Sequence, residues 1–394
     1  MKKLLGFRHT VVAAYVGYIV QAIVNNYITL LFVHFNSEFD IPFSKITLLI
    51  TLNFVTQLAV DLLAAFVVDR IGYRVAVVAA HIFAAAGLIG MAFLPSVMPP
   101  FAGLLISSMV YATGGGLIEV VVSPIIEACP SDDKAGSMSL LHSFYCWGVV
   151  GVIIVSTAFF ALFGIENWRI LACLWAAVPI VNAIVFLFVP IRTLTEKGDG
   201  MTVRELGKTK IFWVFVMLML ASGASELAMS QWASALTEAS LGVSKTVGDL
   251  LGACMFSVLM GATRVFYAKM SGKIRLDRFL MFSALLCVAS YILTAFSPLP
   301  WLSLVGCSLC GISVGLMWPG VYSMGAERFT RGGVTMFAIL ALAGDLGCSS
   351  GPTSVGFLSG LFGDDLKRGL AFGVIFPLIM IIGLFFLKRE KKAK

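Results

Sequence analysis

The chain has 394 residues, of which 59% are hydrophobic and only 12% are charged. A soluble domain typically carries about twice that charged fraction, so the composition excludes an ordinary soluble protein and puts most of the chain in lipid. The net charge of +7 could suit a nucleic-acid partner. The basic residues do not gather on one soluble face, however, and we expect no nucleic acid.

Long apolar runs recur along the chain, each near the roughly 20 residues that a helix needs to cross a bilayer. The first six lie near residues 9–36, 44–68, 74–94, 101–127, 136–161 and 169–189. The second six lie near residues 211–237, 245–268, 278–297, 301–325, 333–357 and 369–387. The sequence therefore predicts an all-α membrane protein with twelve transmembrane helices.

A polar stretch separates the two sets of helices. The predicted domains are an N-terminal six-helix bundle over 1–190, a cytoplasmic linker over 191–210, a C-terminal six-helix bundle over 211–387 and a basic cytoplasmic tail over 388–394. Most of the 28 Lys and Arg residues lie in the termini, the linker and alternate loops. Because short cytoplasmic loops are rich in Lys and Arg, we expect a bacterial inner membrane with both termini in the cytoplasm.

The two halves share residues in one register. A shift of 200 residues places Gly72 on Gly272, Gly115 on Gly315, Ser123 on Ser323 and Glu127 on Glu327. A duplicated six-helix bundle is typical of secondary transporters, whose solute site lies near the bilayer midplane between the halves. A channel or a membrane enzyme has no need of this duplication.

The segment between the second and third spans reads Asp69-Arg70-Ile71-Gly72-Tyr73-Arg74. This segment resembles the cytoplasmic loop signature of the major facilitator superfamily, although Ala65 stands where the family usually has a glycine. The resemblance implies the major facilitator fold, two pseudo-symmetric six-helix bundles, and transport by alternating access.

Physically, Gly72 permits a tight turn, and both arginines can pair with acids at the end of a neighbouring helix, with Glu127 as the natural candidate. The predicted cytoplasmic gate comprises Asp69, Arg70, Gly72, Arg74, Glu127 and Glu327. Ordinary loop charges are the alternative interpretation.

The fourth span carries Glu119, Ser123 and Glu127 at four-residue spacing, so the three share one helix face. With Pro124 directly after Ser123, the stretch resembles the fucose permease branch of the superfamily, in which a Glu four residues before an Asn-Pro serves proton-coupled sugar uptake. Ser123 replaces that Asn here. The resemblance implies a sugar and a proton as partners.

The likeness to this branch extends to Asn25-Asn26 in the first span, but Thr29 takes the place of the carboxylate that the branch carries three residues later. The repeat shift sets Asn26 against Glu226, near the centre of the seventh span. An ionisable residue at that depth is costly and is by default a functional-site hypothesis. We predict Glu119 and Glu226 as proton-coupling residues; a hydrogen-bonded structural acid is the alternative for each.

Amide stripes at four-residue spacing run along the first two spans, Gln21-Asn25-Thr29 and Asn53-Gln57-Asp61. Amides suit sugar hydroxyls because they offer both donors and acceptors, but such stripes also join helices in bilayers. Aromatic rings can stack on sugars or fill apolar space. The predicted substrate-binding residues are Asn25, Asn26, Asn53, Glu119, Ser123, His142, Trp147, Glu226, Gln231, Trp232 and Trp318.

Two charges in apolar surroundings, Arg264 in the eighth span and Asp345 in the eleventh, are predicted to pair with each other. No Gly-rich nucleotide-binding motif occurs, nor any constellation for catalysis, so we expect no cofactor, no metal and no enzyme activity.

The favoured function is uptake of a monosaccharide or similar small polar solute by proton symport, in a monomer surrounded by membrane lipid. The first alternative is an exporter of amphipathic drugs or metabolites. The second is an integral-membrane enzyme or a transport-dead sensor.

Overall fold

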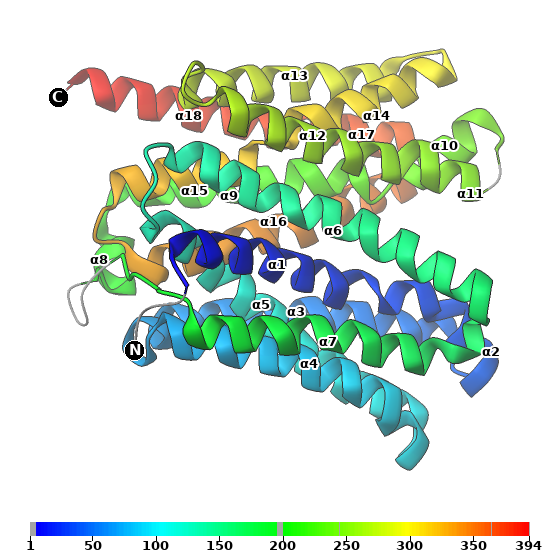
Figure 1. Cartoon of the computed structure of the whole chain (residues 1–394). Coiled ribbons are helices and arrows are strands. Elements are labelled where there is room, and N and C mark those ends of the chain that lie inside the picture. The colour runs from blue at the N-terminus through cyan, green and yellow to red at the C-terminus, as the bar shows by residue number, and fades with distance from the viewer. Residues whose placement is uncertain (1–4, 195–199, 244, 364, 394) are drawn as a thin grey trace. The chain divides into compact units, whose positions relative to one another are not determined.

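The computed structural model describes residues 5–194, 200–243, 245–363 and 365–393, and the regular elements in these ranges are all helices (Figure 1). Within them, twelve helices are long and apolar enough to cross a membrane. The predicted all-α architecture with twelve spans is therefore confirmed.

The chain divides into two compact units. Unit 1 comprises Met1–Pro130, Phe144–Thr202 and Arg331–Ala338, and unit 2 comprises Ser131–Ser143, Val203–Thr330 and Ile339–Lys394. The main division, after Thr202, falls inside the linker predicted over 191–210. Each unit also takes one short segment from the other half of the sequence, which the predicted domain boundaries do not include.

Unit 1 is built from the first six spans. They are α1 (Phe7–Asn26), α3 (Phe43–Ile71), α4 (Tyr73–Val97), α5 (Pro100–Ala128), α6 (Lys134–Phe163) and α7 (Trp168–Phe188). The short helices are η1 (Ile28–Leu31), α2 (Phe32–Phe39) and η2 (Ile165–Asn167). The first ten residues of α6, up to Ser143, belong to unit 2.

Unit 2 contains the remaining helices, and several of its membrane spans are divided into shorter helices. They are α8 (Val203–Lys208), α9 (Lys210–Ser230), α10 (Ala233–Leu241), α11 (Lys245–Gly248), the π-helix η3 (Asp249–Cys254), α12 (Met255–Met270), α13 (Leu276–Phe296), α14 (Pro300–Val314), α15 (Met317–Arg328), α16 (Gly333–Leu361), α17 (Leu366–Gly373) and α18 (Ile375–Ala393). The first turn of α16, up to Ala338, belongs to unit 1.

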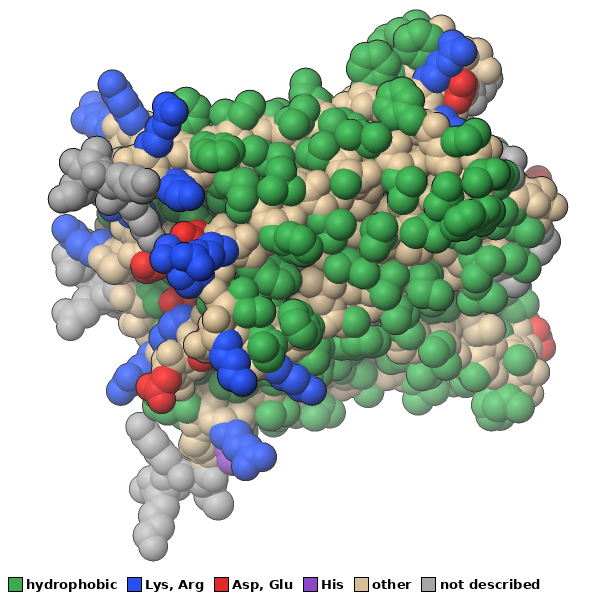
Figure 2. All heavy atoms as spheres, turned by 90° about the horizontal axis from the view of Figure 1, so that it is seen from above, with side chains coloured by type: hydrophobic (Ala, Val, Ile, Leu, Met, Phe, Trp, Pro, Cys, Tyr) green, Lys and Arg blue, Asp and Glu red, His purple; other side chains and the backbone are tan. Residues whose placement is uncertain are grey.

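The helices are apolar on their exposed sides as well as their buried sides. On α3, Leu62, Leu63 and Phe66 are exposed, while Ala64 and Val68 on the same helix are buried. Figure 2 shows hydrophobic side chains over most of the visible face and Lys and Arg side chains concentrated toward one end. Helices are stable in the hydrocarbon of a membrane because all their backbone hydrogen bonds form within the segment.

The turn between α3 and α4 depends on a single glycine. Gly72 ends α3 with φ of 94° and ψ of 149°, a backbone region that is essentially confined to glycine. Helix α4 begins at the next residue, Tyr73. Gly272, the counterpart of Gly72 at the repeat shift, has no positive φ.

We expect Gly72→Ala to lower the midpoint of thermal unfolding of the purified protein, since the forced backbone costs about 1–3 kcal/mol. A Cβ at Gly72 would meet no atom within 4 Å, and the same is true at Gly272. Gly272→Ala is therefore a matched control that adds the methyl group without the strain. Equal midpoints for the two variants would show that the positive φ is not needed.

Candidate functional site

Unit 1 buries a row of polar side chains of α1 against α5 and α3. The hydroxyl oxygens of Tyr18 and Ser123 lie 2.9 Å apart, and Gln21 Nε2 donates to Glu119 Oε2 at 2.5 Å. One turn further along α1, Asn25 Oδ1 accepts from Gln57 Nε2 at 3.0 Å. We call these six residues the amide cluster: Tyr18, Gln21, Asn25, Gln57, Glu119 and Ser123.

Helix periodicity explains the order of these contacts. The three α1 residues are spaced by three and four, so they lie on one face of the helix. Their partners on α5, Ser123 and then Glu119, follow in reverse order, as two antiparallel helices require. Gly115 continues this order: a Cβ there would lie 3.1 Å from Val24 and 3.9 Å from Asn25 Oδ1. Glycine at this position therefore leaves room for the Val24 side chain.

The amide cluster is shielded from solvent but keeps unused hydrogen-bonding capacity. Glu119 is 9% exposed and Gln21 is 4% exposed. A buried carboxylate needs hydrogen-bond donors, and Gln21 supplies one. The buried oxygens Gln21 Oε1 and Asn53 Oδ1, the latter on α3 one turn from Gln57, bond to no residue in the described ranges. Both oxygens can accept a hydrogen bond from a hydroxyl group.

Unit 2 buries Arg264 of α12 among acceptors. Its Nε donates to the Gly315 carbonyl at 2.7 Å and its Nη1 donates to the His142 carbonyl at 2.9 Å. Its Nη2 lies 3.6 Å from Glu226 Oε2 on α9, and the two side chains are only 4% and 14% exposed. The guanidinium is thus compensated by one carboxylate and two backbone carbonyls.

The Gly315 carbonyl is available because of a proline. In a continuous helix this carbonyl would accept from the N–H four residues later, but that residue is Pro319, which has no N–H. The tenth span is accordingly divided, with α14 ending at Val314 and α15 beginning at Met317. Arg264 Nε supplies the missing donor.

Aromatic rings complete the surroundings of this ion pair. The centroids of the His142 and Tyr322 rings are 5.7 Å apart, and Trp318 meets Tyr322 edge-on with centroids 6.2 Å apart. His142 lies on the part of α6 that belongs to unit 2. We call the following residues the arginine cluster: His142, Glu226, Arg264, Gly315, Trp318 and Tyr322.

The structure sorts the predicted substrate-binding residues into three groups. Asn25, Glu119 and Ser123 meet in the amide cluster, with the buried Asn53 one turn from Gln57, and His142, Glu226 and Trp318 meet in the arginine cluster. The other four, Asn26, Trp147, Gln231 and Trp232, lie outside both clusters. Binding of a solute by any of these residues stays a prediction.

The four outlying residues have other surroundings. Asn26 Nδ2 donates to the Ala22 carbonyl of its own helix at 2.9 Å. Trp232 Nε1 donates to the Pro352 carbonyl of α16 at 3.1 Å. Trp147 and Gln231 are exposed. Hydrogen bonds such as those of Asn26 and Trp232 are typical of side chains with a structural role.

Six members of the clusters are not among the predicted substrate-binding residues: Tyr18, Gln21, Gln57, Arg264, Gly315 and Tyr322. Gln21 and Gln57 belong to the predicted amide stripes, and Tyr18 stands three residues before Gln21, so helical spacing could have found these three. The pairing of Arg264 with Asp345 stays a prediction, and the structure adds an ion pair of Arg264 with Glu226 that the sequence did not predict.

Asp69 of the predicted gate holds the first turn of α16, within unit 1. Its carboxylate accepts from the Val334 and Thr335 N–H groups, each at 3.3 Å, and from the Thr335 hydroxyl at 3.1 Å. Such a carboxylate satisfies free N–H groups at a helix N-terminus and suits the positive end of the helix dipole. Asp69 is therefore a helix cap.

The structure corrects the predicted pairing of Arg74 with an acid such as Glu127. Its guanidinium donates to the carbonyls of Phe186, Leu187 and Val189 at 2.6, 2.7 and 2.8 Å. The last carbonyls of α7 have no helical partner and carry the negative end of the dipole, so they attract the cation.

The other gate residues lie at helix ends. Arg70 and Glu327 are exposed, at the ends of α3 and α15, and Glu127 is half-buried near the end of α5. Gating by these residues stays a prediction. Within the described residues, no group of three or more His, Cys, Asp or Glu side chains could hold a metal ion.

The ion pair of the arginine cluster can be tested by a double-mutant cycle. Arg264→Gln and Glu226→Gln each leave a buried charge without its partner, so we expect each to destabilise the protein by about 3 kcal/mol. The double variant should lose clearly less than the sum, since neither charge remains. Thermal unfolding of the purified protein measures the cycle, with exposed Arg278→Gln as the control for charge loss; strictly additive losses would argue against coupling.

Comparisons with known proteins agree on one family and one fold. The sequence profile of the Major Facilitator Superfamily matches residues 14–352 and 238–394. No curated protein matches the chain at the level of sequence.

Three solved structures are similar over nearly the whole chain. The E. coli fucose:proton symporter is 11% identical, with 95% of this chain and 98% of that chain covered and a TM-score of 0.76. A proton:xylose symporter bound to 6-bromo-6-deoxy-D-glucose is 13% identical, with 97% and 95% covered and a TM-score of 0.82. The human organic anion transporter MFSD10 is 16% identical, with 96% and 99% covered and a TM-score of 0.72. At these identities the likeness shows the fold alone.

Proposed function

Because the chain belongs to the major facilitator superfamily, we propose that this membrane transporter takes up a monosaccharide or another small polar solute together with a proton. In this proposal, transport needs neither a bound cofactor nor a domain that hydrolyses nucleotides. The energy comes from an ion gradient. The chain acts as a transporter and not as an enzyme.

The observation that carries the proposal is the buried Gln21–Glu119 pair, 2.5 Å apart, inside a membrane-spanning unit. Polar residues are costly at this depth and are retained where they serve transport. Around the pair, the amides of Asn25, Asn53 and Gln57 offer donors and acceptors that suit hydroxyl groups. A hydroxyl-rich solute is the chemistry that this lining favours.

Gln21 also gives Glu119 a means of changing its protonation state inside the protein. The ionised carboxylate accepts from Gln21 Nε2. Once protonated, the carboxyl becomes a donor and needs an acceptor, which Gln21 Oε1 provides after rotation of the amide group. One side chain thereby stabilises both states of Glu119, as a proton-coupling carboxylate requires.

Glu226 is the second proposed coupling residue, under a different constraint. Its carboxylate lies 3.6 Å from the Arg264 guanidinium, and an adjacent cation favours the ionised form. A change in the protonation of Glu226 therefore alters its attraction to Arg264. We propose that protonation of Glu226 is coupled to rearrangement of this ion pair.

The similar solved structures also support this proposal. Two of them are named as fucose:proton and proton:xylose symporters, and a third is named as an organic anion transporter. Trp318 and Tyr322, whose rings contact each other in the arginine cluster, suit an amphipathic solute, so export of amphipathic drugs or metabolites is the second candidate. A transport-dead sensor has no observation in its favour.

The proposed location is a bacterial inner membrane, with both termini in the cytoplasm and the chain acting as a monomer in lipid. The distribution of Lys and Arg among the loops supports this orientation.

The solute class is tested by thermal stabilisation of the purified protein across matched panels of sugars, polyols, nucleosides and amphipathic drugs. We expect stabilisation by one or more sugars or polyols, since a ligand that binds only the folded state raises its unfolding midpoint. Weaker stabilisation of Asn53→Ala and Gln57→Ala by the same compound would link binding to the amides. Stabilisation by drugs alone, unaffected by these variants, would favour the exporter.

Proton coupling is tested with Glu119→Gln in proteoliposomes. We expect this variant to exchange labelled solute across the membrane but to lose accumulation driven by an inward proton gradient, because the amide cannot take up a proton. Glu166→Gln, an exposed acid in η2 outside both clusters and the predicted gate, is the control and should keep accumulation. Gradient-driven uptake that persists in both Glu119→Gln and Glu226→Gln would end the proposal of coupling through these acids.

A further inference from the structure

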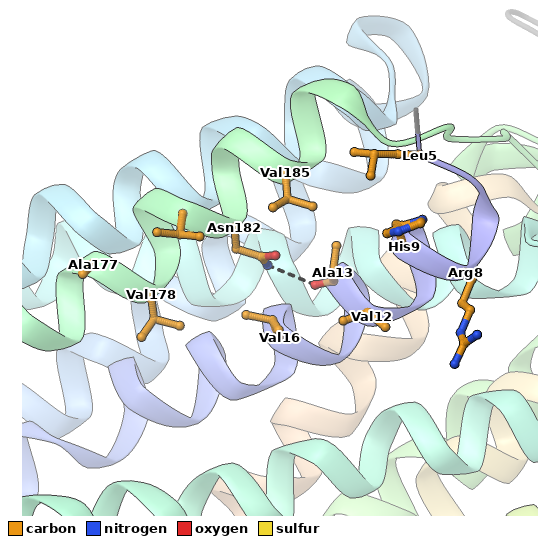
Figure 3. A pocket seen from close by; sticks show the side chains of 11 residues that line it. Leu5, Arg8, His9, Val12, Ala13, Val16, Ala177, Val178, Asn182 and Val185 are labelled. Carbon is orange, nitrogen blue, oxygen red and sulfur yellow. Dashed lines mark hydrogen bonds between the residues drawn. The ribbon is translucent and has the colours of Figure 1, made fainter. Parts of the chain in front are cut away.

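An open groove of about 820 Å³ runs between α1 and α7 of unit 1 (Figure 3). Its long walls are apolar: Val12 and Val16 line it from α1, and Val178, Val181 and Val185 line it from α7. The volume falls within the range of ordinary ligand pockets. The groove belongs to neither polar cluster.

One end of the groove is basic. Arg8 and His9, at the start of α1, line this end, and the Arg192 guanidinium lies 5.3 Å from the centroid of the neighbouring Phe7 ring. In the ranges that the structure describes, no carboxylate forms an ion pair with Arg8 or Arg192. The positive end of the α1 dipole adds to the same charge.

His9 is oriented to offer a donor at this end. Its Nδ1 accepts from the Gly6 N–H at 3.1 Å, so in the neutral ring the proton is on Nε2. The Nε2–H of His9 and the guanidinium of Arg8 are donors that suit an anion with several oxygen acceptors, such as a phosphate group.

The polar side chain in the middle of the groove, Asn182, has its two donor hydrogens in use. The two hydrogens of the Asn182 amide are used by the Ala13 carbonyl at 3.0 Å and by His81 Nε2 at 2.8 Å. Figure 3 shows Asn182 directed at Ala13 of α1. With valine side chains along both walls, the middle of the groove fits hydrocarbon.

We propose that this groove binds an anionic phospholipid, with an acyl chain between α1 and α7 and the phosphate at Arg8 and His9. The occupant follows from the two ends of the site. A membrane-spanning unit meets lipid along its flanks, burial of methylene groups in an apolar groove is favourable, and cations at the membrane surface attract anionic headgroups.

The test uses the full-length protein, delipidated in detergent, with phosphatidylglycerol and phosphatidylcholine of identical acyl chains. Native mass spectrometry measures how many lipids stay bound, and thermal unfolding measures the stabilisation. We expect phosphatidylglycerol to bind more tightly than phosphatidylcholine. Arg8→Gln should weaken its binding about fivefold, the effect of one surface cation.

Two further variants separate the headgroup from the chain. Ala177→Phe places a ring in the groove from an exposed position on α7 and should weaken phosphatidylglycerol binding while the protein stays monodisperse. Arg278→Gln removes an exposed cation from unit 2 and should leave binding unchanged.

Equal binding of the two lipids, or equal effects of Arg8→Gln and Arg278→Gln, would overturn the proposal. Stabilisation by inorganic phosphate that matches stabilisation by phosphatidylglycerol would also overturn it, because a free anion rather than a lipid would then be the ligand.

Discussion

A guanidinium group is tolerated in hydrocarbon only when its donors meet acceptors, and Arg264 satisfies that condition through the hydrogen bond that a proline cannot make. Pro319 lacks the N–H that would bond to the Gly315 carbonyl, and Arg264 Nε donates to that carbonyl instead. The remaining nitrogens then meet the His142 carbonyl and Glu226. The break in the tenth span and the charge in the eighth are therefore one feature, and the positions of the other residues of the arginine cluster follow from it.

The two units meet the cost of buried polarity in different ways. In unit 1, Glu119 is held by a neutral amide, and the neighbouring Asn25–Gln57 bond is also neutral. In unit 2, Glu226 faces a fixed cation. An amide can serve a carboxylate in both protonation states, whereas an arginine stabilises only the ionised state. The same residue type thus has different chemistry in each half, although the halves share an architecture.

The sequence was sufficient for the number of spans and the helical class, because runs of about 20 apolar residues are a strong signal. The superfamily was indicated by the resemblance of residues 69–74 to its loop signature. It also indicated that Glu119 and Ser123 share one polar helix face and that Asn25 lies on the polar face of another helix, since spacing along one helix is visible in a sequence. Partners across helices were harder. The pairing of Arg264 with Glu226 and the contact of Arg74 with the end of α7 depend on which helices pack together, and on carbonyls that no residue letter reveals. The repeat shift of 200 residues was also inexact: α1 ends at Asn26 and α9 ends at Ser230, so the helix ends correspond about one turn later.

Those two helix ends show how each unit supports an interruption in a membrane span. Directly after α1, the Tyr27 hydroxyl donates to the Trp168 carbonyl at 2.6 Å, at the start of α7. Directly after α9, Trp232 Nε1 donates to the Pro352 carbonyl of α16 at 3.1 Å. A helix that stops inside lipid exposes backbone groups, and in both units an aromatic donor at the interruption ties the chain to a neighbouring helix. Because Tyr27 and Trp232 combine a large apolar surface with a single polar atom, they join each interrupted span to a neighbouring helix without adding a charge to the lipid-embedded part of the chain.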